Sequence, residues 1–191
     1  MAKARVYFTR EITPQAMDRL YDALGIRLSG KTAVKISTGE PGGHNFLQPA
    51  LIGPLTERLH GTIVECNTAY EGRRNTTQEH WKAIQENGFL DIAPCDIMDE
   101  TGELALPVTN GMHLQENLVG AHLRNYDSML VLSHFKGHMM GGFGGALKNI
   151  SIGIASAHGK AHIHGVGVPE ELWTADHNSF LECMADAAKS V

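Results

Sequence analysis

The sequence is poor in cysteine, with three residues among 191, at Cys66, Cys95 and Cys183. Their number is odd and none of them belongs to a CxxC pair. Neither a disulfide framework nor a four-thiolate metal site is therefore indicated. Three free thiols are typical of a reducing compartment, which favours a cytoplasmic location.

Long apolar runs and an excess of positive charge are also missing. No stretch approaches the ~20 apolar residues that a membrane-spanning helix needs, and the N-terminal MAKARVYFTR has no secretory apolar core. Asp and Glu (21) outnumber Lys and Arg (16), which gives a net charge of −5. Nucleic-acid binders usually carry a basic patch instead. We therefore expect neither a membrane nor a nucleic acid as a partner.

The composition is 42% hydrophobic and 19% charged, which is typical of a folded globular domain. Short apolar segments alternate with segments of helical periodicity. The expected strands cover residues 4–9, 32–37, 62–67 and 128–133, with further short strands within 89–120. The expected helices follow Thr13, begin at Pro49, cover 77–88 and 145–156, and close the chain after a cap at Asn178 or Ser179.

This alternation predicts one α/β domain over residues 1–191, a Rossmann-like layered fold with a mostly parallel sheet. No internal repeat or low-complexity linker indicates a second domain. Because the chain ends on a helix without a following strand, it fits either a complete doubly wound fold or one truncated at the C-terminus.

Three loops follow expected parallel strands and carry glycine together with polar or ionisable groups. In open parallel sheets, ligands bind beyond the carboxyl ends of the strands. We therefore expect loops 38–45, 68–76 and 134–145 to form one small-molecule site. The second and third loops and the helical turn beyond them offer these candidates: Glu71, Arg73, Lys136, His138 and Lys148.

The third loop contains the stretch GGFGG, with glycines at Gly141, Gly142, Gly144 and Gly145. Such glycines either make a tight turn with close strand–helix packing, or they present bare backbone N–H groups at a helix N-terminus, which binds anions. Lys148, one turn inside that helix, would add a positive charge. GxxxxGK[ST] and GxGxxG are both absent, so the sequence favours a phosphate without indicating which phosphate.

Histidine is abundant, and seven of the 11 residues lie after residue 120. The segment HGKAHIHG places His162 and His164 two positions apart. If this segment is extended, both side chains face one side and share a metal. The alternative is a solvated, His-rich surface loop. Glu71 beside Arg73 also has two interpretations, a catalytic acid or a surface ion pair.

Three segments carry a family resemblance: VKISTGEPGGHN, NTAYEGRRNTTQEHWKAIQENGF and LVLSHFKGHMMGGFGGALKNISIGIASAHGK. Through them the whole chain resembles the uncharacterised DUF362 family. Many members of that family carry a ferredoxin-like insertion with two Cys-rich runs for [4Fe–4S] clusters. This chain has no such run, so no iron–sulfur cluster is expected in it.

The segment from Gly137 to His164 is also similar to the cofactor region of nickel-pincer-nucleotide lactate racemases. The shared features are a His, a GFxGG turn, a Lys, GIAS and a later His. The resemblance implies that Lys148 carries a phosphorylated organic cofactor covalently, that His164 ligates nickel and that His138 is a proton-transfer base. Racemases use a second His on an earlier loop, where this chain has Tyr70 or Glu71. Each face of the reacting carbon needs its own positioned group, so a symmetric two-base racemisation is not expected.

Two functional hypotheses follow. The first is a metal- and cofactor-dependent enzyme, isomerase-like or oxidoreductase-associated, with a nucleotide-like cofactor at the glycine-rich loop, further contacted by Lys136 and Arg73. The metal ligands would be His164 and His162, and the catalytic groups His138, Lys148 and Glu71. The second is a non-catalytic ligand-binding or redox-partner module without its own cluster. Either one is compatible with a homo-oligomer.

Overall fold

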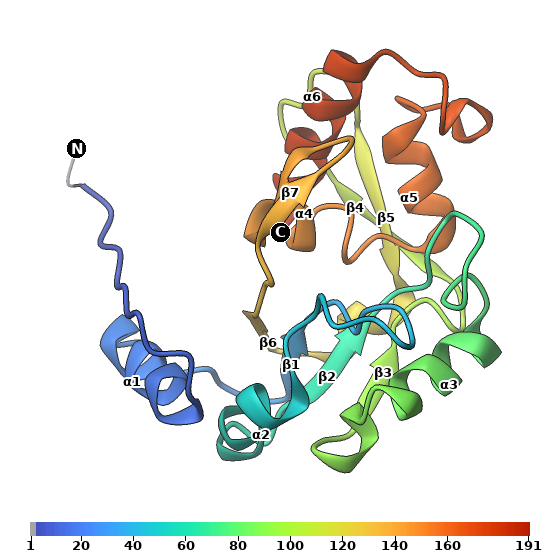
Figure 1. The fold of residues 1–191 in the computed structure, drawn as a ribbon. Coiled ribbons are helices and arrows are strands. Elements are labelled where there is room, and N and C mark those ends of the chain that lie inside the picture. The colour runs from blue at the N-terminus through green and yellow to red at the C-terminus, as the bar shows by residue number, and fades with distance from the viewer. Residues whose placement is uncertain (1–2) are drawn as a thin grey trace.

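The computed structural model describes residues 3–191 and is built on a sheet of four parallel strands (Figure 1). The strands are β1 (Thr32–Lys35), β2 (Thr62–Glu65), β3 (Cys95–Ile97) and β6 (Ser128–Val131). Their order across the sheet is β3-β2-β1-β6. The expected α/β layered fold with a parallel sheet is therefore confirmed.

Strand β1 lies in the interior of this sheet. Its Val34 is in register with Ile63 of β2 and with Leu130 of β6. All four of its residues are buried. A strand buried on both faces is normally apolar throughout, so the one charged residue of β1, Lys35, is exceptional.

Helices α2 (Pro49–Arg58) and α3 (Thr77–Glu86) cover one face of the sheet, and α1 (Pro14–Leu24) packs against α2. The core between the sheet and these helices consists of Val34, Ile36, Phe46, Ile52, Ile63, Ile84, Phe89 and Ile97.

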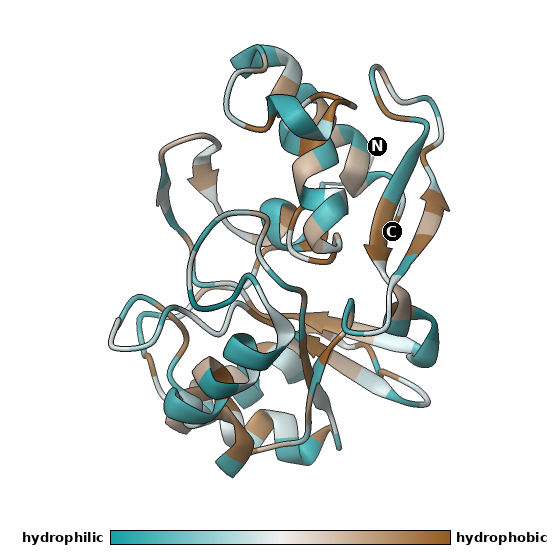
Figure 2. Cartoon of the chain, turned by 90° about the vertical axis from the view of Figure 1, so that its right-hand side faces the viewer, coloured by the Kyte–Doolittle hydropathy of each residue, from teal (hydrophilic) through white to brown (hydrophobic). Residues whose placement is uncertain are grey.

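A second unit rises from the opposite side of the sheet (Figure 1). Its antiparallel ribbon of β4 (Glu103–Pro107) and β5 (Glu116–Gly120) packs with α4 (Ala146–Ile150), α5 (Ala157–His164) and α6 (His177–Ala188). Hydrophobic segments lie on the strands of both the ribbon and the main sheet (Figure 2). The core of this unit consists of Val108, Leu114, Ile152, Ala155, Ile163, Phe180, Cys183, Met184 and Ala187.

The glycine-rich segment forms a small antiparallel hairpin between β6 and α4. Its strands are β7 (Lys136–His138) and β8 (Gly142–Gly144). Gly142 has a φ of +62°, a left-handed conformation that favours glycine. In the described part of the chain, three short 3-10 helices lie in other connections: η1 (Phe89–Asp91), η2 (Ala121–Asn125) and η3 (Pro169–Glu171).

The local signals placed most helices correctly. The side chain of Thr13 accepts a hydrogen bond from the backbone N–H of Ala16 at 3.2 Å, and Pro14 then begins α1. Gly25, with a φ of +65°, ends this helix. Within residues 3–191, no helix combines the length and the apolar composition needed to cross a bilayer.

Some expected elements were wrong. Residues 4–9 form no strand, because no neighbouring strand in the described part of the chain receives their backbone hydrogen bonds. Val6 and Phe8 are accordingly 87% and 82% exposed. The helix expected at 145–156 ends at Ile150. The last helix is capped by Asp176, which accepts from the backbone N–H of Ser179 at 2.9 Å, and not by Asn178 or Ser179.

Candidate functional site

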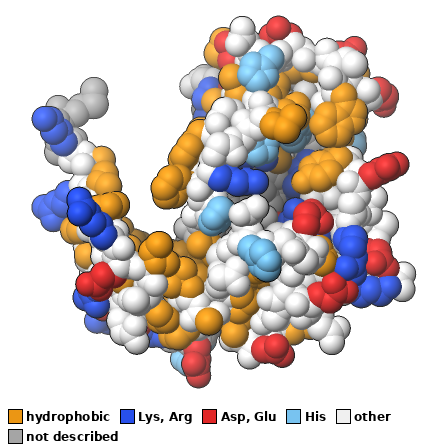
Figure 3. Space-filling model, viewed as in Figure 1, with side chains coloured by type: hydrophobic (Ala, Val, Ile, Leu, Met, Phe, Trp, Pro, Cys, Tyr) orange, Lys and Arg blue, Asp and Glu red, His pale blue; other side chains and the backbone are white. Residues whose placement is uncertain are grey.

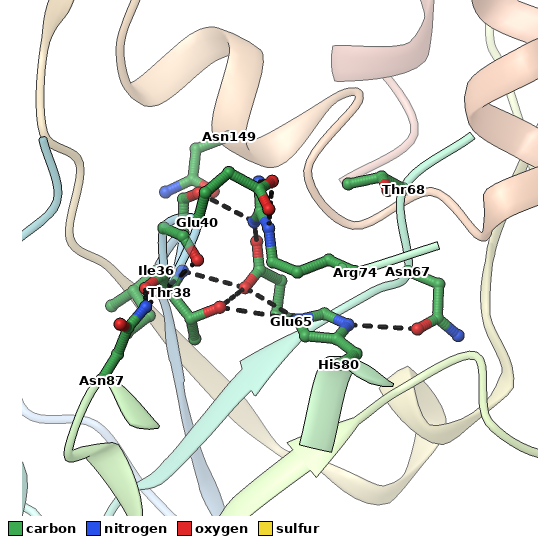
Figure 4. Close-up of polar contacts among 12 residues, drawn as sticks. Ile36, Thr38, Glu40, Glu65, Asn67, Thr68, Arg74, His80, Asn87 and Asn149 are labelled. Atoms are coloured by element: carbon green, nitrogen blue, oxygen red, sulfur yellow. Dashed lines mark hydrogen bonds and ion pairs between the residues drawn. The ribbon is translucent and has the colours of Figure 1, made fainter. Parts of the chain in front are cut away.

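The loops after β1 and β2 meet at one arginine (Figure 4). Arg74 donates from Nε and Nη2 to Oε1 of Glu40, at 2.8 and 2.7 Å. Its Nη1 donates to Oε1 of Glu65 at 2.9 Å. The expected convergence of these two loops at the carboxyl edge of the sheet is therefore present in the fold.

Glu65 is the buried anion of this edge. Its Oε2 accepts from the backbone N–H and the hydroxyl of Thr38, at 2.9 and 2.5 Å, and lies 3.3 Å from Nε2 of His80. Burial alone would raise the pKa of Glu65, but Arg74 and His80 outweigh burial and hold it well below its usual value. The carboxylate is thus ionised, and its bonding capacity is taken up within the protein.

Lys35 is the buried cation beside it. Its Nζ donates to the carbonyl of Ile36 at 2.5 Å and to Oδ1 of Asn149 at 2.8 Å. Burial lowers the pKa of Lys35 to about 8, although the nearby Glu65 acts in the opposite direction. Only 1% of the residue is exposed, so its positive charge is not screened by water.

Two further lysines come from the helices of the second unit. Lys160 of α5 is buried and donates to the carbonyl of Ala155 at 2.6 Å, and burial lowers its pKa. Lys148 of α4 is half-buried. Burial lowers the pKa of Lys148 to about 8, with further lowering from Lys160, Lys35, Lys136 and Arg74.

We refer to Lys35, Lys136, Lys148, Lys160 and Arg74 as the cationic cluster. Figure 3 shows Lys, Arg and His side chains gathered around a hollow in the centre of this face. In the described residues, Nζ of Lys148 has no hydrogen-bond acceptor, although the four other cations of the cluster all act on its pKa. Within the described residues, Nζ of the exposed Lys136 likewise has no acceptor, so Lys148 and Lys136 are the cations of the cluster that are available to a ligand.

The carboxylates near the cluster are already engaged. Glu65 and Glu40 pair with Arg74. Asp99 accepts from the backbone N–H groups of Asn67 and Ala157, both at 2.9 Å. The five cations of the cluster therefore outnumber these three carboxylates.

His164 lies on α5 beside this cluster. Its Nδ1 is 2.7 Å from the carbonyl of Lys160, so Nδ1 must carry the proton and donate it. The ring stacks on Phe180, with centroids 4.8 Å apart. Burial lowers the pKa of His164 to about 4. His164 is therefore neutral, and its Nε2 offers a lone pair to a metal or a proton donor.

His138, in the hairpin, has the opposite tautomer. Its Nδ1 accepts from the backbone N–H groups of Met140 and Gly141, at 3.2 and 3.0 Å. Burial, followed by Lys148 and Lys136, lowers the pKa of His138. The neutral ring carries its proton on Nε2, so this geometry favours His138 as a hydrogen-bond donor. A role as base would require the proton to leave Nε2.

His162 does not join His164. The expectation that they share a face required an extended segment, and this was wrong because residues 157–164 form α5. Residues two positions apart in a helix are related by a rotation of about 200° around its axis, so their side chains point to nearly opposite sides. In the part of the chain that the structure describes, no three His, Cys, Asp or Glu side chains are grouped to hold a metal. Protein side chains alone do not provide a closed metal site here.

Glu71 and Arg73 lie outside the cationic cluster. Arg73 donates to the two carboxylate oxygens of Glu86, at 2.7 and 2.6 Å, on the exposed surface of α3. Glu71 is exposed and lines an open pocket of about 510 Å³ together with Ala69, Tyr70 and Trp173.

Of the two interpretations of GGFGG, the structure favours a tight turn over a set of bare backbone N–H groups that bind an anion. The N–H of Gly141 points at His138. A Cβ on Gly145 would lie 2.6 Å from the exposed ring of Phe143, which would have to shift to make room. Gly144 is buried and paired with Lys136 in the hairpin. Helix α4 has only five residues, which makes its N-terminus a poor source of the expected anion-binding dipole.

The sequence analysis did not select Lys35, Glu65, Lys160 or Asn149. The signal for the first two is a charged residue inside an apolar strand, in TAVKIS and TIVECN. A strand buried on both faces excludes such residues unless they find partners at its end. Lys160 and Asn149 lack a comparable signal, because charged and amide residues are ordinary in helices.

Comparisons with known proteins agree with the family resemblance. The model of the family described as "Domain of unknown function (DUF362)" matches residues 32–191. This range contains all strands of the sheet and the whole cationic cluster, and leaves α1 outside. Comparisons with curated proteins and with solved structures gave no match. Because the family match covers most of its length, the chain belongs to the DUF362 family.

Proposed function

We propose that this domain binds a phosphorylated, nucleotide-like cofactor at the cationic cluster and acts as a cofactor-dependent enzyme. The observation that carries this proposal is the excess of positive charge around Lys148, whose neighbouring carboxylates already have partners. Buried charges of one sign are costly unless they are paired. A phosphate would supply the missing negative charge and accept the hydrogen bonds that Lys148 is free to donate.

Lys148 is also the group best suited to hold the cofactor covalently. Its amine has no acceptor within residues 3–191, and its pKa is lowered to about 8. At pH 7 the amine of Lys148 is therefore neutral and nucleophilic in roughly one-tenth of the molecules. The resemblance of residues 137–164 to lactate racemases also suggests Lys148 as the residue that holds the cofactor covalently.

A divalent metal, nickel by resemblance, fits this site only in part. His164 offers one neutral nitrogen, and the residues described supply no group of three ligands. The remaining ligands would have to come from the cofactor itself. Such a cofactor would supply the proton or hydride chemistry, while His138 would donate a hydrogen bond from Nε2 to a developing negative charge.

The alternative is a non-catalytic ligand-binding or redox-partner module. It is favoured by the position of Glu71, which lines the exposed pocket with Tyr70 and Trp173 and lies outside the cationic cluster. In this case the phosphate site would be occupied reversibly and Lys148 would stay unmodified.

The experiment is mass spectrometry with elemental analysis on protein purified from its own host. The enzyme hypothesis predicts an added mass on the peptide that contains Lys148, with stoichiometric nickel, and no added mass in Lys148→Arg. A phosphate-binding protein with a bare Lys148 peptide would favour the non-catalytic module. An adduct on another residue would overturn the role of Lys148.

A further inference from the structure

We propose that the pocket between Tyr70 and Trp173 binds the aromatic, nitrogen-bearing base of a nucleotide whose phosphate lies at the cationic cluster. This inference rests on the proposed function and adds to it the chemical class of the ligand. It also assigns a role to two exposed aromatic residues that the phosphate site does not use.

The pocket is a corner made of two rings. Their centroids lie 6.4 Å apart and their planes are inclined by 55°. Trp173 is 67% exposed and Tyr70 is 45% exposed. A planar ring that stacks on one of them meets the other by its edge, and both arrangements are favourable for aromatic pairs. The volume of about 510 Å³ has room for a base.

One loop connects this corner to the phosphate site. The backbone N–H of Thr68 donates to the carbonyl of Arg74 at 2.8 Å, and its hydroxyl donates to the carbonyl of Tyr70 at 3.3 Å. The loop therefore presents Tyr70 on its outer side while the guanidinium of Arg74 is fixed to Glu65. A ligand that spans the two places has its anionic end at Lys148 and its ring at the aromatic corner, while the guanidinium of Arg74 stays paired with Glu40 and Glu65.

Glu71 gives the pocket its polarity. Its exposed carboxylate lines the pocket and can only accept hydrogen bonds when ionised. It suits a ring with N–H donors, such as the amino group of adenine, and it repels a second phosphate. This arrangement favours the base at the pocket and the phosphate at the cluster, and not the reverse.

Fluorescence can report on this pocket directly, because the chain has two tryptophans, Trp81 and Trp173. In Trp81→Phe, Trp173 is the only tryptophan. Three probes separate the parts of the ligand: ribose 5-phosphate carries only the phosphate end, adenosine only the ring, and AMP both. Calorimetry on the wild-type protein, Trp173→Ala and Trp173→Phe gives the affinities, with Phe8→Ala as a control that removes another exposed aromatic ring far from the pocket in sequence.

We expect AMP and adenosine to quench Trp173 and ribose 5-phosphate to leave it unchanged. Stacking of one base should make AMP bind about 5- to 160-fold tighter than ribose 5-phosphate. Trp173→Ala should remove that advantage without changing the affinity for ribose 5-phosphate. Trp173→Phe should restore most of it, and Phe8→Ala should have no effect.

The outcomes distinguish this inference from the proposed function. If AMP and ribose 5-phosphate bind equally and Trp173→Ala changes neither, the base site is overturned while the phosphate site stands. If adenosine quenches Trp173 but ribose 5-phosphate does not bind, the base site stands and the phosphate site falls. If none of the probes binds, both are overturned.

Discussion

Nζ of Lys35 donates a hydrogen bond to Oδ1 of Asn149 at 2.8 Å and so joins the central strand to the helix that carries Lys148. Asn149 also donates from Nδ2 to the carbonyl of Leu132 and the hydroxyl of Ser133, at 3.2 and 3.0 Å. One amide thereby fixes α4 to the ends of two adjacent parallel strands. The position of the Lys148 amine on α4 therefore depends on the hydrogen bonds of Asn149, which we call the Asn149 clamp.

Removing the clamp should destabilise the fold. Asn149→Ala leaves the buried Nζ of Lys35 with a single acceptor, and an unsatisfied buried polar group costs about 1–3 kcal/mol. Urea unfolding followed by circular dichroism should show a loss of that size. Asn178→Ala, at an exposed position of α6, should change the free energy of unfolding by less than about 0.5 kcal/mol. Equal effects of the two substitutions would contradict the clamp.

The buried ion pair should matter far more than an exposed one. Glu65→Gln leaves the guanidinium of Arg74 without its buried carboxylate, and breaking such a pair costs about 3–5 kcal/mol. Glu86→Gln breaks the exposed pair with Arg73, which water screens, and should therefore cost much less than Glu65→Gln. Denaturant titrations of the two variants test this order. A stability of Glu65→Gln within 1 kcal/mol of the wild-type protein would refute it.

Without a bound anion, stability should rise with pH between 7 and 8.5. In the folded protein, the pKa of Lys35 is lowered to about 8, whereas the unfolded chain holds this proton up to about 10.5. The unfolded state therefore binds more protons in this range, and the free energy of unfolding increases with pH. The contribution of Lys35 is roughly 1 kcal/mol. Thermal or urea unfolding of Lys35→Met should show a smaller rise, and an unchanged slope would exclude Lys35 as the source.

Anion affinity should change with pH in the opposite direction. Sulfate keeps two negative charges from pH 6 to 9.5, so its own protonation does not interfere. Because the pKa values of Lys148 and Lys35 are lowered to about 8, the cluster loses positive charge above that pH. Sulfate affinity, measured by calorimetry, should be constant from pH 6 to 7 and should fall above pH 8. An affinity that stays level to pH 9.5 would show that these lysines do not bind the anion.

The elements with strong local signals were predictable from the sequence. Thr13 and Pro14 marked the start of α1, and the alternation of strands and helices gave the parallel sheet. Because the carboxyl ends of parallel strands meet at one edge of the sheet, loops 38–45 and 68–76 were also expected to lie together, and the pair Glu40–Arg74 confirms this.

Other features depend on distant contacts that a linear pattern does not contain. Apolar spacing at residues 4–9 fits a strand, but the fold described here places no pairing edge beside them. The orientation of His162 depended on whether its segment was helical. Lys35 and Lys160 are separated by 125 positions, and only the packing of α5 over the strand ends brings their charges near Lys148.

The most direct test is a calorimetric titration with pyrophosphate of the wild-type protein, Lys148→Met and Lys82→Met. Lys82 is an exposed lysine that pairs with Glu79 on the surface of α3, which makes it the matched control for loss of charge. A charge-assisted hydrogen bond is worth about 1.5–3 kcal/mol, so Lys148→Met should bind pyrophosphate about 10-fold more weakly or worse. Lys82→Met should bind it like the wild-type protein. Equal affinities in all three proteins, or no binding by the wild-type protein, would contradict a phosphate site at the cationic cluster.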